Sequence, residues 1–263
     1  MNRRLLLGAA GLAFAAPMLT TRGAFGQTVD ELLRRKKITV GMLVDIPPFG
    51  SMGSDQKPVG YDADVAALMA KYMGVELELV PVTGPNRIPY LLTNRVDVLV
   101  ATFGITPERA KQVWFSIPYS VLEVVLMGPK KHDVKTVADA KGLRIAVARA
   151  STQDLMLTQQ ATGAQMLRFD DDATAGQALI AGRADLVGCN HMQARQLIKD
   201  NPALELENKV VLSRQWQGIT LRRGQTDLLQ WINTFLYFVK NSGELNAINQ
   251  KWFETDLPPM PTF

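Results

Sequence analysis

The chain has 263 residues, of which 29 are lysine or arginine and 25 are aspartate or glutamate. Three of the arginines lie in the first 26 residues, which contain no acidic residue, so the rest of the chain holds 26 basic and 25 acidic residues. This near-neutral balance, without a lysine-rich run or a basic stripe among aromatics, argues against a nucleic-acid partner. The single cysteine, Cys189, excludes an intramolecular disulfide.

Residues 1–26 have the pattern of an export signal. Arg3 and Arg4 precede an apolar stretch that is short for a membrane span, and small residues follow up to Gly26, where we expect cleavage. The paired arginines fit a twin-arginine signal and an ordinary secretory signal about equally well, so the export route stays open. No later apolar run approaches about 18 residues. We therefore expect a soluble periplasmic protein that does not insert into the membrane.

Strand-like and helix-like runs alternate through the first part of the mature chain. They are ITVGML (38–43), DVAALMAKYMG (64–74), VELELV (75–80), IPYLLTN (88–94) and DVLVA (97–101). In the first helical run Val65, Leu68, Met69 and Tyr72 fall at helical spacing, and Gly74 is placed to end the helix. This alternation predicts a mostly parallel sheet with helices on its faces.

The same alternation restarts after residue 120. The second set comprises VLEVVLMG (121–128), LRIAVA (143–148), a helix from Ser151, AQMLRF (164–169), TAGQALIAG (174–182), ADLVG (184–188) and MQARQLIK (192–199). The last stretch, 218–253, offers one strand and two amphipathic helices, too few strands for a further domain. We therefore predict an α/β fold of two lobes, 27–119 plus 217–263 and 120–216, with hinge segments near 119–125 and 212–217.

The segment GITPERAKQVWFSIPY (104–119) contains a helix start with a basic residue in its first turn. Thr106 can cap free backbone N–H groups, Pro107 loses nothing at the first helical position, and Glu108 favours the positive end of the dipole. Arg109 then lies beside exposed amides, a place that attracts carboxylates or phosphates. The competing interpretation, which local evidence favours, is an exposed arginine paired with Glu108 or another surface acid.

A second helix start occurs in RASTQD (149–154). Ser151 and Asp154 have the spacing of a capping box, which would explain both residues without a ligand. Thr152 and Gln153 are the residues of this segment that could face a bound anion.

Seven motifs in order carry a family resemblance: VGMLVDIPPFG, KPVGYDADVAALMAKYMG, NRIPYLL, DVLVATFGITPERAKQVWFSIPY, ARASTQ, AGRADL and KWF. Together they closely resemble the bacterial extracellular solute-binding proteins of family 3, which deliver polar amino acids to ABC importers. The similarity covers nearly the whole mature chain. It implies a periplasmic-binding-protein type II fold that closes on its ligand like a hinge, and a membrane ABC permease as partner.

The resemblance also implies a set of ligand-binding residues. Arg109 would grip the α-carboxylate of the ligand, helped by groups around Thr102, Gly104 and Thr152. The tail FSIPY would lead the chain from this turn into the hinge. The remaining expected ligand-binding residues are Gln153, Asn190, Arg87, Asp172, Ile46 and Phe49.

One departure from the family pattern concerns the ligand ammonium. The position that matches the family's acidic residue, after the strand ADLVG, is Asn190, which carries no charge. Either another acid takes its place, with Asp172 the first candidate and Asp45 a less securely placed one, or the ligand lacks a free ammonium.

Other departures concern the ligand side chain. Leu43 and Ile46 stand where binders of basic amino acids carry an acid and an aromatic ring, so lysine and arginine are disfavoured as ligands. Arg87 matches an arginine that binders of acidic amino acids use for the second carboxylate. We therefore expect a small polar or acidic amino acid, or a related carboxylate, although Arg87 could instead pair with a surface acid.

Two alternatives to a transport role remain. The same fold resembles a periplasmic enzyme, cyclohexadienyl dehydratase, but the position of its proton-donating glutamate is Gln193 here, and an amide is no general acid at neutral pH. A receptor that presents its ligand to a signalling partner could keep the same cleft. Cys189 and His191 are too few for a metal site, and no dinucleotide or phosphate-loop motif occurs. We expect no catalytic residue, metal or cofactor.

Overall fold

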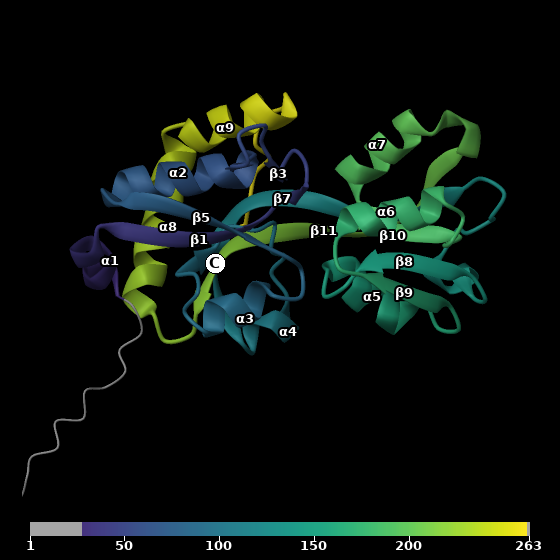
Figure 1. The fold of residues 1–263 in the computed structure, drawn as a ribbon, viewed down its shortest axis with the longest axis horizontal. Helices are drawn as coiled ribbons and strands as arrows, with labels where there is room; N and C mark the ends of the chain where they lie inside the picture. Colours follow the sequence, from purple (N-terminus) through teal and green to yellow (C-terminus); the bar gives the residue numbers. More distant parts are fainter. Residues whose placement is uncertain (1–27, 262–263) are drawn as a thin grey trace, which may run out of the picture.

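The computed structural model describes residues 28–261, and it divides into two lobes joined by a pair of long strands (Figure 1). The predicted export signal, residues 1–26, lies outside the described residues. The first lobe is built from the elements α1 to α4 together with α8 and α9, and the second from the elements between β7 and β11.

Elements of the first lobe come from both ends of the described chain. They are α1 (Val29–Arg35), β1 (Lys37–Leu43), β2 (Asp45–Ile46), β3 (Gly50–Met52), β4 (Pro58–Val59), α2 (Tyr61–Met73), β5 (Glu76–Val82), α3 (Arg87–Leu92), β6 (Val98–Leu99), α4 (Pro107–Ala110), α8 (Thr226–Asn241) and α9 (Glu244–Phe253).

The second lobe is one uninterrupted stretch between two 17-residue strands. These strands are β7 (Val113–Pro129) and β11 (Leu206–Arg222). Between them lie η1 (Val137–Ala140), β8 (Arg144–Ala148), α5 (Thr152–Gln160), β9 (Gln165–Phe169), α6 (Asp172–Ile180), β10 (Leu186–Asn190), α7 (His191–Asp200) and η2 (Pro202–Leu204).

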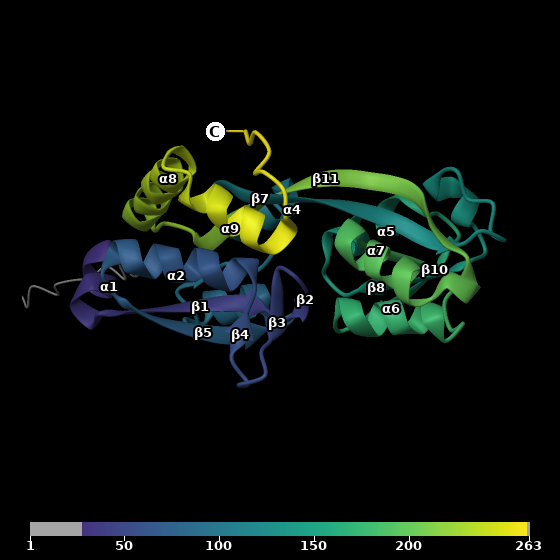
Figure 2. The ribbon, with the colours of Figure 1, turned by 90° about the horizontal axis from the view of Figure 1, so that it is seen from above.

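A single eight-stranded sheet runs through both lobes in the order β5-β1-β6-β11-β7-β10-β8-β9. The outer pairs β1–β5, β8–β9 and β8–β10 are parallel, whereas β7 and β11 pair antiparallel along their whole length, with several register shifts. At about 3.3 Å per residue a 17-residue strand reaches roughly 55 Å, long enough to belong to both lobes. Figure 2 shows this pair crossing from one lobe to the other.

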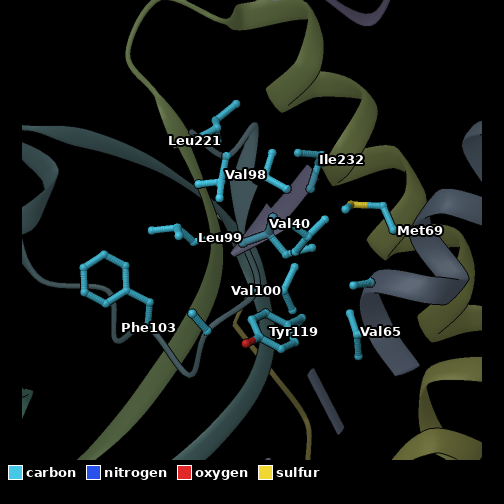
Figure 3. Close-up of a cluster of buried hydrophobic side chains, with 14 of the residues drawn as sticks. Val40, Val65, Met69, Val98, Leu99, Val100, Phe103, Tyr119, Leu221 and Ile232 are labelled. Carbon is cyan, nitrogen blue, oxygen red and sulfur yellow. The ribbon is translucent and has the colours of Figure 1, made fainter. Parts of the chain in front are cut away.

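The core of the first lobe joins segments that are far apart in the sequence. Val40 and Val98 of the sheet pack with Met69 of α2 and Ile232 of α8 (Figure 3). Every residue of the apolar face of α8 is buried: Leu228, Ile232, Phe235, Leu236 and Val239. In the second lobe two separate clusters lie against the sheet, one with α6 and α7 and the other with α5 and η1.

Local signals at helix ends were mostly confirmed. The helix α2 ends at Gly74, which has φ 70°, and Thr106 caps α4 by accepting a hydrogen bond from Arg109 N at 3.2 Å. The capping box predicted at α5 is wrong in one half. Ser151 Oγ accepts from Asp154 N at 3.1 Å, but the Asp154 carboxylate accepts from Ala150 N instead, because Ala150 turns back with φ 59°.

None of the described helices combines the length and apolar character that crossing a bilayer requires.

Candidate functional site

A cavity with several charged side chains lies between the two lobes, and most of the residues expected to bind a ligand line it. The lining includes Ile46, Arg87, Thr102, Arg109, Thr152, Gln153, Asp172 and Asn190, joined by Leu43 and Asp45. Its volume is about 30 Å³, enough for a water-sized group. An amino acid therefore enters only when the lobes part or the lining side chains move.

Three contacts hold the lobes together at this cavity. Arg109 of the first lobe donates from Nη1 to Thr152 Oγ1 at 3.0 Å and from Nη2 to the Ala150 carbonyl at 2.9 Å. Asp45 accepts from the backbone N of Asp172 at 3.0 Å. These groups are the ones that a ligand in the cleft would meet.

Arg109 is held from behind by its own lobe. Its second Nη1 hydrogen goes to the Gly104 carbonyl at 2.8 Å, and its guanidinium carbon lies 4.3 Å from the centre of the Phe103 ring. The side chain is 5% exposed. Of its five N–H donors, Nε–H and one Nη2 hydrogen make no hydrogen bond within residues 28–261. Two donors remain for an incoming carboxylate, as bidentate binding requires.

Arg87 is a second buried guanidinium on the same wall. It is 4% exposed, donates from Nη1 to the Ala101 carbonyl at 3.1 Å, and lies 4.4 Å from the centre of the same Phe103 ring. Burial lowers the pKa of Arg87 to about 10, and the charges of Asp172 and Asp45 oppose that shift. Burial also lowers the pKa of Arg109 well below its usual value, and the charge of Arg87 adds to the effect.

The surface-pairing interpretation is therefore wrong for both arginines. Within residues 28–261 neither guanidinium forms an ion pair, whereas Glu108 pairs with Lys111 at 2.6 Å. Because a buried unpaired cation is costly, each arginine favours an anion in the cavity.

Thr102 belongs to a buried network that reaches the start of the connecting strand. Its Oγ1 donates to Asp62 Oδ2 at 2.8 Å, and Tyr119 OH donates to the other oxygen of Asp62 at 2.8 Å. The backbone N of Thr102 donates in turn to Tyr119 OH at 3.3 Å, and Thr102 has φ 49°. Burial raises the pKa of Asp62 to about 6, while these hydrogen bonds oppose the shift. The hydroxyl hydrogen of Thr102 is therefore used within this network, by Asp62.

Asp172 and Asp45 bring two carboxyl groups together from opposite lobes. Gln153 Nε2 donates to Asp172 Oδ1 at 2.9 Å, and both side chains are buried. Burial, and then the charge of Asp45, raise the pKa of Asp172 to about 7. Burial likewise raises the pKa of Asp45. A cation between them would relieve both charges.

Asn190 lines the cavity, and its amide oxygen caps a helix. Oδ1 caps α7 by accepting from Gln193 N at 2.9 Å, because β10 passes directly into the helix at this residue. Its Nδ2 makes no hydrogen bond within residues 28–261, so the group that it offers the cavity is a donor.

Two expected residues lie outside the cavity lining. Gly104 acts through its carbonyl, which fixes Arg109 from behind. Phe49 is buried in an aromatic cluster, 5.9 Å between ring centres from Tyr61 and 4.9 Å from Phe253, and does not line the cavity. Gln215 was not predicted as a ligand-binding residue, yet it lines the cavity from β11. Its only sequence signal was that it is a polar residue inside the predicted hinge segment near 212–217.

Cys189 and His191 do not form a reactive pair. Cys189 is buried, and burial raises the pKa of its thiol. His191 Nδ1 accepts from Glu123 N at 3.2 Å, and burial lowers its pKa. Within residues 28–261 no three His, Cys, Asp or Glu side chains are grouped so that they could hold a metal ion.

Two lobes on crossing strands, with two buried arginines on one side of the cleft and the buried Asp172 on the other, define a protein of the two-lobed binding class. Residues 38–255 match the family described as bacterial extracellular solute-binding proteins, family 3. The chain belongs to this family.

Individual relatives agree with this assignment. The chain is 30% identical to the L-cystine-binding protein TcyJ of Escherichia coli K12, over 98% of this chain and 97% of the relative. A mutant of ArgBP from T. maritima is 36% identical with a TM-score of 0.79, over 86% of this chain and 99% of that one. The ancestral amino acid-binding protein AncCDT-1, a precursor of cyclohexadienyl dehydratase, is 30% identical with a TM-score of 0.77, over 86% and 98%.

Proposed function

We propose that this chain is a periplasmic binding protein that captures a small polar or acidic amino acid, or a related carboxylate, and delivers it to an ABC importer. The observation that carries the proposal is the pair of buried, unpaired guanidiniums of Arg87 and Arg109 on one wall of the interlobe cavity. A bound anion would compensate their two positive charges. Relatives named for cystine and arginine support an amino acid as the carrier of that anion.

The mechanism is closure without chemistry. A ligand carboxylate held by Arg109 also reaches Thr152 in the other lobe, since these two side chains already meet at 3.0 Å. A ligand that bridges them binds the closed arrangement better than the open one, and this difference shifts the population towards closure. The bending segments in this proposal are those near 119–125 and 212–217, within the paired strands β7 and β11.

The charges of the cavity favour a ligand with two carboxylates and an ammonium. Arg109 binds the α-carboxylate and Arg87 the second carboxylate, while Asp172 and Asp45 take the place of the charge missing at Asn190. L-glutamate and L-aspartate have this composition, and L-cystine has the same two carboxylates with a second ammonium. Free arginine is disfavoured because its guanidinium would meet two fixed ones in a cavity of low dielectric constant.

The test begins with the identification of co-purified small molecules by mass spectrometry. The mature protein is then unfolded, washed and refolded, and calorimetry measures binding of L-glutamate, L-aspartate, L-glutamine, L-cystine and L-arginine. Arg109→Met should weaken binding at least 100-fold, since it removes a charged bidentate partner. Arg95→Met is the matched control, because Arg95 also covers an aromatic ring, Tyr90 at 4.1 Å, but is exposed and away from the cavity.

Two results would overturn the proposal. If none of the five amino acids binds the refolded protein, the ligand class is wrong. If Arg109→Met binds as tightly as Arg95→Met, the site is wrong.

The enzymatic alternative has a separate test. In this chain Gln193 donates from Nε2 to the Asp172 carbonyl, so its amide serves as a structural donor and supplies no acidic proton. Mass spectrometry of each amino acid after incubation with the protein should find it unchanged. Catalytic turnover would favour the enzyme. A ligand presenter, the other alternative, would retain binding but fail to support uptake through a reconstituted permease.

A further inference from the structure

Gln215 occupies an unusual place for a glutamine. It lies in the long strand β11, opposite Leu122 of β7, and its side chain is 8% exposed. The side chain lines the interlobe cavity together with Arg109 and Thr102. Its Oε1 is buried and has no hydrogen-bond partner within residues 28–261. A buried acceptor left without a donor is costly, and native proteins rarely keep one without a reason.

The carboxamide of Gln215 is pressed against the loop that carries the proposed site. A Cβ at Gly104 would lie 2.4 Å from both Cδ and Nε2 of Gln215, so a larger residue there would have to displace the carboxamide. The same loop is hydrogen-bonded to β11, since Ile105 N donates to the Trp216 carbonyl at 2.9 Å. The amide therefore lies against Gly104, the residue whose carbonyl orients Arg109.

Gln217 also has an unsatisfied amide but lies away from the cavity, so it serves as a comparison for Gln215. It lies two residues further along β11, is fully buried, and both of its amide atoms lack partners within residues 28–261. Gln217 does not line the cavity. A molecule in the cleft can therefore satisfy Gln215 and cannot reach Gln217.

We propose that Gln215 is a ligand-binding residue whose carboxamide oxygen accepts a hydrogen bond from an N–H group of the bound amino acid. This inference rests on the proposed function and adds a neutral acceptor to the charged groups of the site. The ligand then contacts a connecting strand as well as the walls of both lobes. A ligand without an N–H donor leaves the acceptor unsatisfied, so the residue selects amino acids against plain carboxylic acids.

The experiment uses Gln215→Met and Gln217→Met, because methionine keeps the length of the side chain and lacks the amide. Calorimetry measures binding of L-glutamate, L-aspartate, L-glutamine and L-cystine, with glutarate as the analogue of glutamate that has no amino group. Gln215→Met should weaken amino-acid binding about tenfold, the effect of one lost hydrogen bond to a charged donor. Gln217→Met should leave it unchanged.

Two further readouts separate binding from structure. The preference for L-glutamate over glutarate should shrink in Gln215→Met, a change that a purely structural role would not cause. The melting temperature of the ligand-free variant should hold or rise, since an unsatisfied acceptor is removed.

The remaining outcomes show whether the inference alone fails or whether the proposed function fails with it. If wild type binds an amino acid and Gln215→Met binds it equally well, the inference is overturned while the proposed function stands. If wild type binds glutarate but none of the four amino acids, only the inference is overturned. If it binds neither, both are overturned.

Discussion

Replacing Asp172 by asparagine should make the stability of the ligand-free protein less dependent on pH. Burial, and next the charge of Asp45, raise the pKa of Asp172 from an ordinary 3.8 to about 7, while Arg87 opposes the shift and Asp171 adds to it. Between pH 4 and 7 the folded protein therefore keeps a proton that the unfolded chain has released. Stability falls as pH rises through this window, and the loss is complete above it.

The size of the effect follows from the shift. About three pKa units at 1.36 kcal/mol each correspond to roughly 4 kcal/mol in the free energy of unfolding at pH 8. Asparagine keeps the shape of the side chain and does not titrate. Asp172→Asn should thus exceed wild type by about 2 kcal/mol at pH 5 and by up to about 4 kcal/mol at pH 8.

Urea unfolding at pH 5 and pH 8, followed by circular dichroism, measures the difference. Asp170→Asn is the matched control, because Asp170 also lines the cavity but its side chain is 81% exposed. The substitution that raises stability should lower the affinity for L-glutamate. Asp172→Asn should weaken L-glutamate binding at pH 8, and wild type should bind about tenfold more weakly at pH 6 than at pH 8, since only about a tenth of Asp172 is ionised there.

Equal stability differences at the two pH values would refute the argument that Asp172 is buried with a raised pKa. Unchanged L-glutamate affinity in Asp172→Asn would refute its role as the partner of the ammonium, whatever the stability data show.

Three other substitutions probe Arg87 in the cavity lining and two residues behind it, Gly104 and Tyr119. Gly104→Ala places a methyl group 2.4 Å from the Gln215 side chain, and should cost about 1–3 kcal/mol of stability and weaken ligand binding, as thermal unfolding and calorimetry would measure. Arg87→Met should stabilise the ligand-free protein, because an unpaired buried charge is removed, and should weaken L-glutamate binding more than L-glutamine binding in the same calorimetric assay. Tyr119→Phe removes the hydroxyl that donates to Asp62 at 2.8 Å and should lower the urea-unfolding free energy by about 1–3 kcal/mol.

Much of the architecture was readable from short-range patterns in the sequence. The apolar spacing in α2, the glycine that ends it and the threonine that caps α4 act within a few residues, so local rules predict them. The ordered motifs identified the family, and the family carried the two-lobed fold with it. The sequence also placed Arg109 beside Thr152 by resemblance, and these side chains do meet.

Local rules failed where a side chain had a choice of partners. Asn190 could have offered its oxygen to a ligand, but the backbone of α7 begins at that residue and takes the oxygen. Phe49 was expected at the ligand, yet it packs against Tyr61 and Phe253, the last of these more than 200 residues away in the sequence. Such preferences depend on neighbours that only folding brings together.

The sequence by itself determined the alternation of strands and helices, the restart that makes a second lobe, and the chemical types available to the cleft, because these depend on spacing and composition. Tertiary structure alone decided which of those groups remain without a partner. It set Asp172 against Asp45, 127 residues away in the sequence, buried Arg87 without a direct ion pair, and placed Gln215 in the cavity lining from a strand shared by both lobes. Burial and pairing are properties of the packed molecule, and they convert a list of polar residues into a site with a charge pattern.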